Sequence, residues 1–182
     1  MRNVTVQVYQ YDELEPHAQE RARAWFANGL EYPWGADNID TLKAFAELMR
    51  LKIMNYSLGG SDNRSQDVSW RFANGEGAHH FLRGARLWRY VQNNAWLLDL
   101  EKIMSADYSL TGYFMDETIL APLRGFIVRP GVDETWADVV SACISGFERA
   151  YAADVDFYYS DEQIAESIRC NEYEFTESGE RF

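Results

Sequence analysis

The three histidines are the first residues of this chain that could do acid–base or metal chemistry. They are His17, His79 and His80. Neighbouring residues on a helix point about 100° apart, so His79 and His80 do not form the one-turn pair that chelates a metal. A solvated helix start or a satisfied surface pair explains them more simply. We therefore expect no metal site.

The sequence offers no activated nucleophile for covalent catalysis. Its two cysteines, Cys143 and Cys170, show no C-x-x-C spacing, and neither has a candidate base nearby in sequence. No serine lies in a G-x-S-x-G elbow. We expect no catalytic residue, no cofactor and no enzymatic activity.

A glycine-rich segment, Gly59, Gly60 and Ser61, superficially resembles a phosphate-binding loop. It lacks the lysine and the strand-to-helix setting of a P-loop, so the tip of a β-hairpin is the better interpretation. One alternative stays open, an enzyme or nucleotide-binding module whose pocket gathers scattered residues. Its candidate residues are Asp62, Arg64, His79 and His80.

Carboxylates dominate the C-terminal third of the chain. From residue 131 onward the sequence holds thirteen acidic residues and three arginines, within a net charge of −12 for all 182 residues. Carboxylates one helical turn apart are separated by about 6 Å, a spacing comparable to that of phosphates along a nucleic-acid strand. Such a face could occupy the basic groove of a nucleic-acid-binding protein, although a merely solvated face is the simpler alternative. The candidate contacts are Glu134, Asp138, Glu148, Asp154, Asp156, Asp161, Glu162 and Glu166.

Arginines form a second cluster of opposite sign. Between residues 64 and 89 there are five arginines and only two acidic residues. Four of these arginines, Arg64, Arg83, Arg86 and Arg89, are alternative contacts for an acidic partner or a phosphate. They could equally pair with the protein's own acids. Direct nucleic-acid binding is disfavoured because the net charge of −12 repels phosphate.

These side chains need a folded scaffold, and the composition predicts one. Hydrophobic residues make up 47% of the chain, and no apolar run approaches the ~20 residues of a membrane span. The start of the sequence has no signal-peptide pattern. We expect a single domain over residues 1–182, a cytoplasmic location and no membrane partner, while abundant Trp and Tyr leave room for a homodimer surface.

The N-terminal stretch is predicted to organise the fold. In residues 4–9, Val4, Val6 and Val8 alternate with polar residues, as in a half-buried strand. A helix that is capped by Asp12 and ended by Gly29 should cover the valine face.

Other periodic segments complete the predicted fold. Helical spacing recurs over residues 37–49, 79–92, 96–105, 116–128, 135–151 and 161–170, and Asn171 is expected to end the last helix in a left-handed turn. Strands are predicted over 51–58, 68–72 and 172–175, with 108–113 either a strand or an ordered loop. The fold class is therefore α+β, with a small antiparallel sheet of three to four strands covered by about six helices.

Three stretches carry a resemblance to a known group of proteins. They are residues 4–14 (VTVQVYQYDEL), residues 108–113 (YSLTGY), and the ending from SDEQ at 160–163 to NEYEFTESGERF at 171–182. Together they resemble small acidic proteins encoded by phages, prophages and mobile elements. The resemblance implies an accessory protein, a class that often inhibits host defences by stoichiometric binding, as anti-CRISPR proteins do. It implies no catalytic signature and no residue roles.

We therefore expect a non-enzymatic accessory protein that binds and inhibits a host defence protein, with its acidic face as a nucleic-acid mimic. The partner would be a host protein that handles nucleic acid. An antitoxin that binds a toxin is the remaining alternative.

Overall fold

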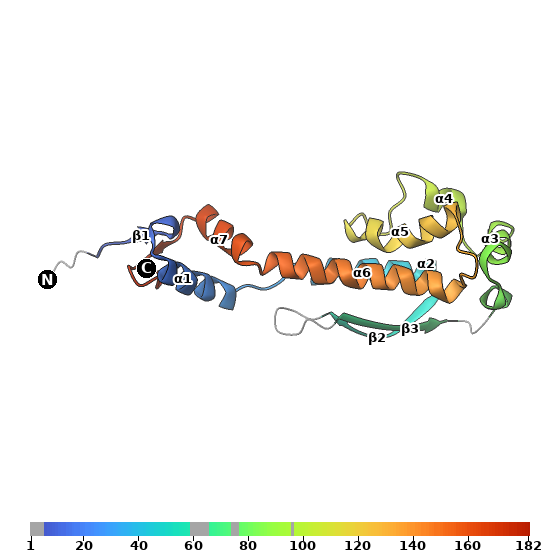
Figure 1. The fold of residues 1–182 in the computed structure, drawn as a ribbon, viewed down its shortest axis with the longest axis horizontal. Coiled ribbons are helices and arrows are strands. Elements are labelled where there is room, and N and C mark those ends of the chain that lie inside the picture. The colour runs from blue at the N-terminus through green and yellow to red at the C-terminus, as the bar shows by residue number, and fades with distance from the viewer. Residues whose placement is uncertain (1–5, 59–65, 74–76, 96) are drawn as a thin grey trace. The chain divides into compact units, whose positions relative to one another are not determined.

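The computed structural model describes residues 6–58, 66–73, 77–95 and 97–182 (Figure 1). The chain divides into two compact units, each held together by contacts between its own residues. Unit 1 comprises Met1–Tyr32 and Asp154–Phe182, and unit 2 comprises Pro33–Ala153. The chain passes between them after Tyr32 and again inside helix α6 (Trp136–Tyr158). The expectation of one domain over residues 1–182 stays a prediction.

Unit 1 joins the two ends of the described chain. Strand β1 (Tyr9–Gln10), a 3₁₀ helix (Tyr11–Glu13) and helix α1 (Pro16–Asn28) come from one end, and helix α7 (Asp161–Cys170) and strand β4 (Glu174–Phe175) come from the other. Helices α1 and α7 pack together, and β1 pairs antiparallel with β4 (Figure 1). Their shared core contains Tyr11, Leu14, Ala18, Ala22, Ile164, Ala165, Ile168 and Phe175.

The predicted strand over residues 4–9 is wrong in extent. Residues 4 and 5 lie outside the described residues, and residues 6–8 belong to no strand, with Val6 48% exposed. Pairing with β1 ends at Phe175, after which the opposite chain enters a turn in which the Thr176 N–H donates to Glu180 O. Among the described residues, Val6 and Val8 therefore form no strand face for a helix to cover.

Two predicted helix ends in unit 1 also differ. Asp12 lies in the 3₁₀ helix and does not cap α1. Helix α1 starts at Pro16, and proline is tolerated in the first turn of a helix. The left-handed residue after α7 is Glu172, with φ 53°, and not Asn171. Ser160 caps the start of α7, because its hydroxyl accepts from Gln163 N.

Unit 2 is built around a hairpin and several helices. Its elements are α2 (Gly35–Leu48), β2 (Leu51–Leu58), β3 (Gln66–Phe72), a 3₁₀ helix (Ala78–Phe81), α3 (Gly84–Gln92), α4 (Leu100–Met104), α5 (Met115–Val128) and the part of α6 up to Ala153. Strands β2 and β3 form the predicted antiparallel hairpin, with Leu51 opposite Phe72. The long apolar stripe of α6, from Trp136 to Tyr151, is buried as predicted.

The single helix predicted over residues 79–92 is divided before Gly84. This glycine has φ 51°, and a Cβ on it would lie 2.0 Å from Val132 O, so only glycine fits. Its N–H donates to Glu134 O, which fastens the start of α3 to the segment before α6.

The α+β class is confirmed, but the predicted sheet of three to four strands is wrong. The described strands form two separate two-stranded antiparallel sheets, β1–β4 and β2–β3, because each pair lies in a different unit. The described residues include seven α-helices. Within them, no helix combines the length and apolar character needed to cross a bilayer.

A buried carboxylate organises the loop over residues 108–113, which is an ordered loop and not a strand. Asp116 is 5% exposed, and its Oδ2 accepts from Leu110 N, Thr111 N and Gly112 N, each at 2.8 Å. Its Oδ1 accepts from the hydroxyls of Thr111 and, from α2, Thr41. One side chain thus joins the loop, α5 and α2.

We expect Asp116→Ala to lower the free energy of unfolding by about 3 kcal/mol, because it removes the charged acceptor of three loop N–H groups and two threonine hydroxyls. Glu117→Ala is the matched control: Glu117 is exposed and pairs with Arg124 at the surface, so its loss should cost less than about 1 kcal/mol. Urea unfolding of both variants measures the difference. Equal losses would show that the loop does not depend on this carboxylate.

Candidate functional site

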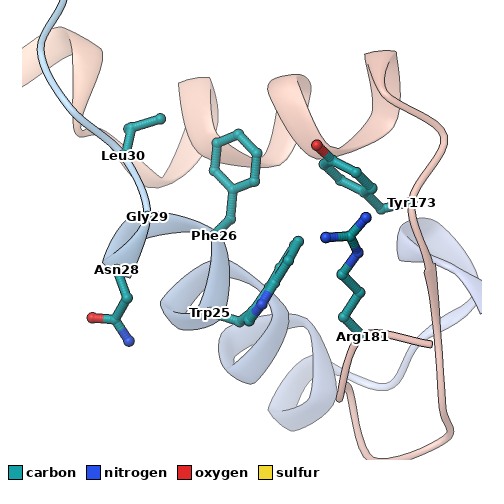
Figure 2. Close-up of a pocket in the computed structure, with 7 residues that line it drawn as sticks. All are labelled: Trp25, Phe26, Asn28, Gly29, Leu30, Tyr173 and Arg181. Carbon is teal, nitrogen blue, oxygen red and sulfur yellow. The ribbon is translucent and has the colours of Figure 1, made fainter.

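The end of α1, the segment before β4 and the C-terminal tail of unit 1 line an open pocket of about 410 Å³ (Figure 2). Its walls combine apolar and aromatic side chains with one guanidinium and one amide. The lining residues are Trp25, Phe26, Asn28, Gly29, Leu30, Tyr173 and Arg181. The pocket lies within the volume range of small-molecule sites in proteins.

Aromatic rings in edge-to-face contact form the floor of this pocket. The centroid of Trp25 lies 5.4 Å from that of Tyr173, with an interplanar angle of 88°, and 5.9 Å from that of the buried Phe175. Phe26 packs beside Trp25 at 6.1 Å. Such arrangements place the positive edge of one ring against the face of the next.

Arg181 lies in the corner between two of these rings. Its guanidinium carbon is 5.0 Å from the centroid of Trp25 and 4.8 Å from that of Tyr173, and Figure 2 shows the guanidinium between them. A tight turn over residues 176–180 sets this position. At that turn Gly179 has φ 83°, and a Cβ there would lie 2.2 Å from Ala18 O.

Three of the eight predicted acidic contacts lie in unit 2, and each has a structural partner there. Glu134 accepts from Gly131 N, and Glu148 accepts from Val68 N, which attaches the hairpin to α6. Asp138 forms a capping box with Thr135 at the start of α6. The hydrogen bonds from the Thr135 hydroxyl and N–H hold the pKa of Asp138 below its usual value.

The other five predicted acidic contacts lie in unit 1. Asp154 accepts from the Tyr32 hydroxyl, Asp161 lies 3.6 Å from Arg23, and Glu166 lies 3.4 Å from Arg169. Asp156 and Glu162 are exposed. The structure thus brings five of the eight into one unit and uses several of them in local contacts.

The charge of the molecule is concentrated in unit 1. Its sequence segments hold fourteen acidic and five basic residues, a net charge of −9 out of −12. The ion pairs in this unit are largely exposed. Arg21 pairs with Glu180, Arg23 pairs with Asp161, and Arg169 pairs with both Asp12 and Glu166. Most of its carboxylates therefore remain in excess of the available cations.

Two of the four predicted arginine contacts share a groove in unit 2. Arg86 and Arg89, both exposed on α3, line a groove of about 380 Å³ with Leu82, Ala85, Tyr90 and Asn93. Arg83 does not line it and instead forms a backbone bridge with Thr135. Arg64 and Asp62 lie outside the described residues.

The two adjacent histidines form an aromatic contact. The rings of His79 and His80 are 4.1 Å apart, and His80 lies 3.8 Å from the ring of Phe72. His79 is 8% exposed, and its Nδ1 has no hydrogen-bond partner among the described residues. Burial, with the neighbouring His80 and Arg50, lowers the pKa of His79 to about 4. His79 is therefore neutral at pH 7.

Neither cysteine lines the pocket of unit 1 or the groove of unit 2. Cys143 is buried in α6, and burial raises the pKa of its thiol to about 12, which disfavours the reactive thiolate. Cys170 is exposed at the end of α7. In the described part of the chain, no three His, Cys, Asp or Glu residues are grouped as metal ligands would be.

No pattern in the sequence indicates the pocket of unit 1. The predicted helix that ends at Gly29 contains Trp25 and Phe26, the predicted strand over 172–175 contains Tyr173, and Arg181 lies in the acidic C-terminal third. No local motif joins residues about 150 positions apart. The available signal was indirect, because Arg181 is a lone cation in an acidic tail that also carries aromatic residues.

The environment of His79 leads to a prediction about stability and pH. Between pH 6.5 and 4 the unfolded chain binds a proton at this residue and the folded chain does not, so acidification favours unfolding in that window. The His79 contribution should be lost by about pH 4 and amount to about 3 kcal/mol, since each unit of pKa shift corresponds to about 1.4 kcal/mol. Urea unfolding of wild type and His79→Gln from pH 7 to pH 4 should show the smaller pH dependence in the variant.

His17→Gln is the control for this experiment, because His17 is exposed on α1. Its pH dependence should match that of wild type. If His79→Gln also matched wild type over the whole window, the proposed neutral state of His79 would be wrong.

Comparison of the chain with protein-family models, with curated proteins and with solved structures finds no match.

Proposed function

We propose that this protein acts by binding, and that its acidic unit 1 occupies a positively charged surface of another protein. The observation that supports this is the concentration of charge, −9 within one compact unit. A field of one sign attracts and orients a partner of opposite sign, and it disfavours nucleic acid as a direct ligand.

The outer side of α7 is the best candidate for the contact. Ile164, Ala165 and Ile168 face the core, which leaves Glu162 and Glu166 on the opposite side, one turn apart. Their Cα atoms are separated by about 6 Å along the helix, comparable to the spacing of phosphates on a strand. This arrangement suits a groove that normally binds nucleic acid.

The resemblance to small acidic proteins of phages and mobile elements supplies the proposed setting. In that setting the partner is a host defence protein that handles nucleic acid, and the chain inhibits it stoichiometrically in the cytoplasm, as an anti-CRISPR protein does. The acidic contacts carried forward are those of unit 1: Asp154, Asp156, Asp161, Glu162 and Glu166. Glu134, Asp138 and Glu148 instead serve the fold of unit 2.

A charge-removal pair tests this proposal. The first variant neutralises four exposed acids of the proposed contact, by Asp156→Asn, Asp161→Asn, Glu162→Gln and Glu166→Gln. Affinity capture from a bacterial lysate identifies the partner, and interferometry with the purified partner gives its dissociation constant. We expect the variant to bind about tenfold to a hundredfold more weakly, since each exposed charge pair contributes roughly 0.2–1 kcal/mol.

The matched variant removes the same total charge from unit 2, by Asp37→Asn, Glu47→Gln, Glu101→Gln and Asp133→Asn, all of them exposed. It should bind as wild type does. Added duplex DNA should compete with the protein for its partner. The proposal would be contradicted if the two variants bound the partner with equal affinity. It would also be contradicted if added DNA left the binding of the protein to its partner unchanged.

A further inference from the structure

The pocket of unit 1 contains a cation that has no anionic partner among the residues that the structure describes. Among the described arginines of unit 1, Arg21, Arg23 and Arg169 each make an ion pair, and Arg181 makes none. In a unit of net charge −9, carboxylates are plentiful near any surface cation. Arg181 nevertheless lies on the faces of Trp25 and Tyr173.

This placement leaves the donors of Arg181 available. Its side chain donates no hydrogen bond to the described part of the protein, although a guanidinium carries five N–H donors in a planar fork. Contact with aromatic faces holds the group by cation–π attraction without using those donors. The fork matches the two oxygens of a carboxylate or phosphate.

The rest of the pocket suits the apolar part of a ligand. Trp25 and Phe26 at the end of α1, with Leu30 just after it, line one side of the pocket, and the Tyr173 ring packs against Trp25 and Phe26 (Figure 2). A volume of about 410 Å³ accommodates a molecule of one or two rings. An aromatic ring can pack on these residues while its anionic group reaches Arg181.

We propose that this pocket binds a planar organic anion, an aromatic ring that carries a carboxylate or a phosphate. The ring packs against Trp25, Phe26 and Leu30, and the anionic group receives hydrogen bonds from Arg181. This inference does not depend on the acidic surface of α7, which is formed by other residues. Removal of one activity should leave the other intact.

Three compounds with the same ring system test the charge requirement: 1-naphthoate, 1-naphthyl phosphate and the neutral 1-naphthamide. Isothermal titration calorimetry with the full chain should detect at least one of the anions, with a dissociation constant of about 1 mM or tighter. The amide should bind at least about tenfold more weakly, because it cannot form a charged pair with Arg181. The stronger anion identifies the carboxylate or the phosphate as the preferred group.

Arg181→Gln should weaken binding of that anion by about tenfold or more, and Arg181→Lys should weaken it less, because lysine keeps the charge but loses the planar fork. Arg89→Gln is the matched control, since Arg89 lines the separate groove of unit 2. It should bind as wild type does. Thermal unfolding checks that each variant is folded, and the comparison of anion with amide in wild type needs no variant.

Four results would overturn the proposal. They are no binding of either anion, equal binding of anion and amide, unchanged affinity in folded Arg181→Gln, and loss of affinity in Arg89→Gln.

Discussion

The packing of α1 against α7 is the interaction on which unit 1 depends. It joins residues from opposite ends of the described chain, and Ala18 and Ala22, both fully buried, allow the two helices to approach closely. The two-residue pairing of β1 with β4 and the burial of Phe175 close the same core. A two-stranded ladder this short is marginal by itself, so the helix packing must supply most of the stability.

Both proposed sites follow from this one contact. The acidic residues of unit 1 come from two separate segments, and each segment alone carries only part of the charge of −9. The aromatic pocket likewise needs Trp25 and Phe26 from α1 and Tyr173 and Arg181 from the opposite end. The cation of the pocket and the anions of the surface can coexist in one unit because the aromatic rings hold Arg181 apart from the ion pairs that the other arginines make.

Unit 2 shows that an acidic residue in a helix need not belong to a binding surface. Glu148 holds β3 to α6, Asp138 caps α6, and Asp116 gathers the N–H groups of a loop. Each carboxylate accepts hydrogen bonds from backbone N–H groups that would otherwise lack a partner. The same residue types that suggest a charged face in the sequence therefore also serve as local structural acceptors.

Local patterns in the sequence determined much of the secondary structure. The apolar period of residues 136–151, the caps at Ser160 and Thr135 and the alternation in β3 each depend on neighbours a few positions apart, and all three are present. Only the tertiary structure decided which strands pair, where β1 ends and which side chains surround Arg181. These depend on residues about 150 positions apart, and no short-range period or motif encodes such a contact. The physical reason is that long-range packing selects among several placements that the local pattern allows equally.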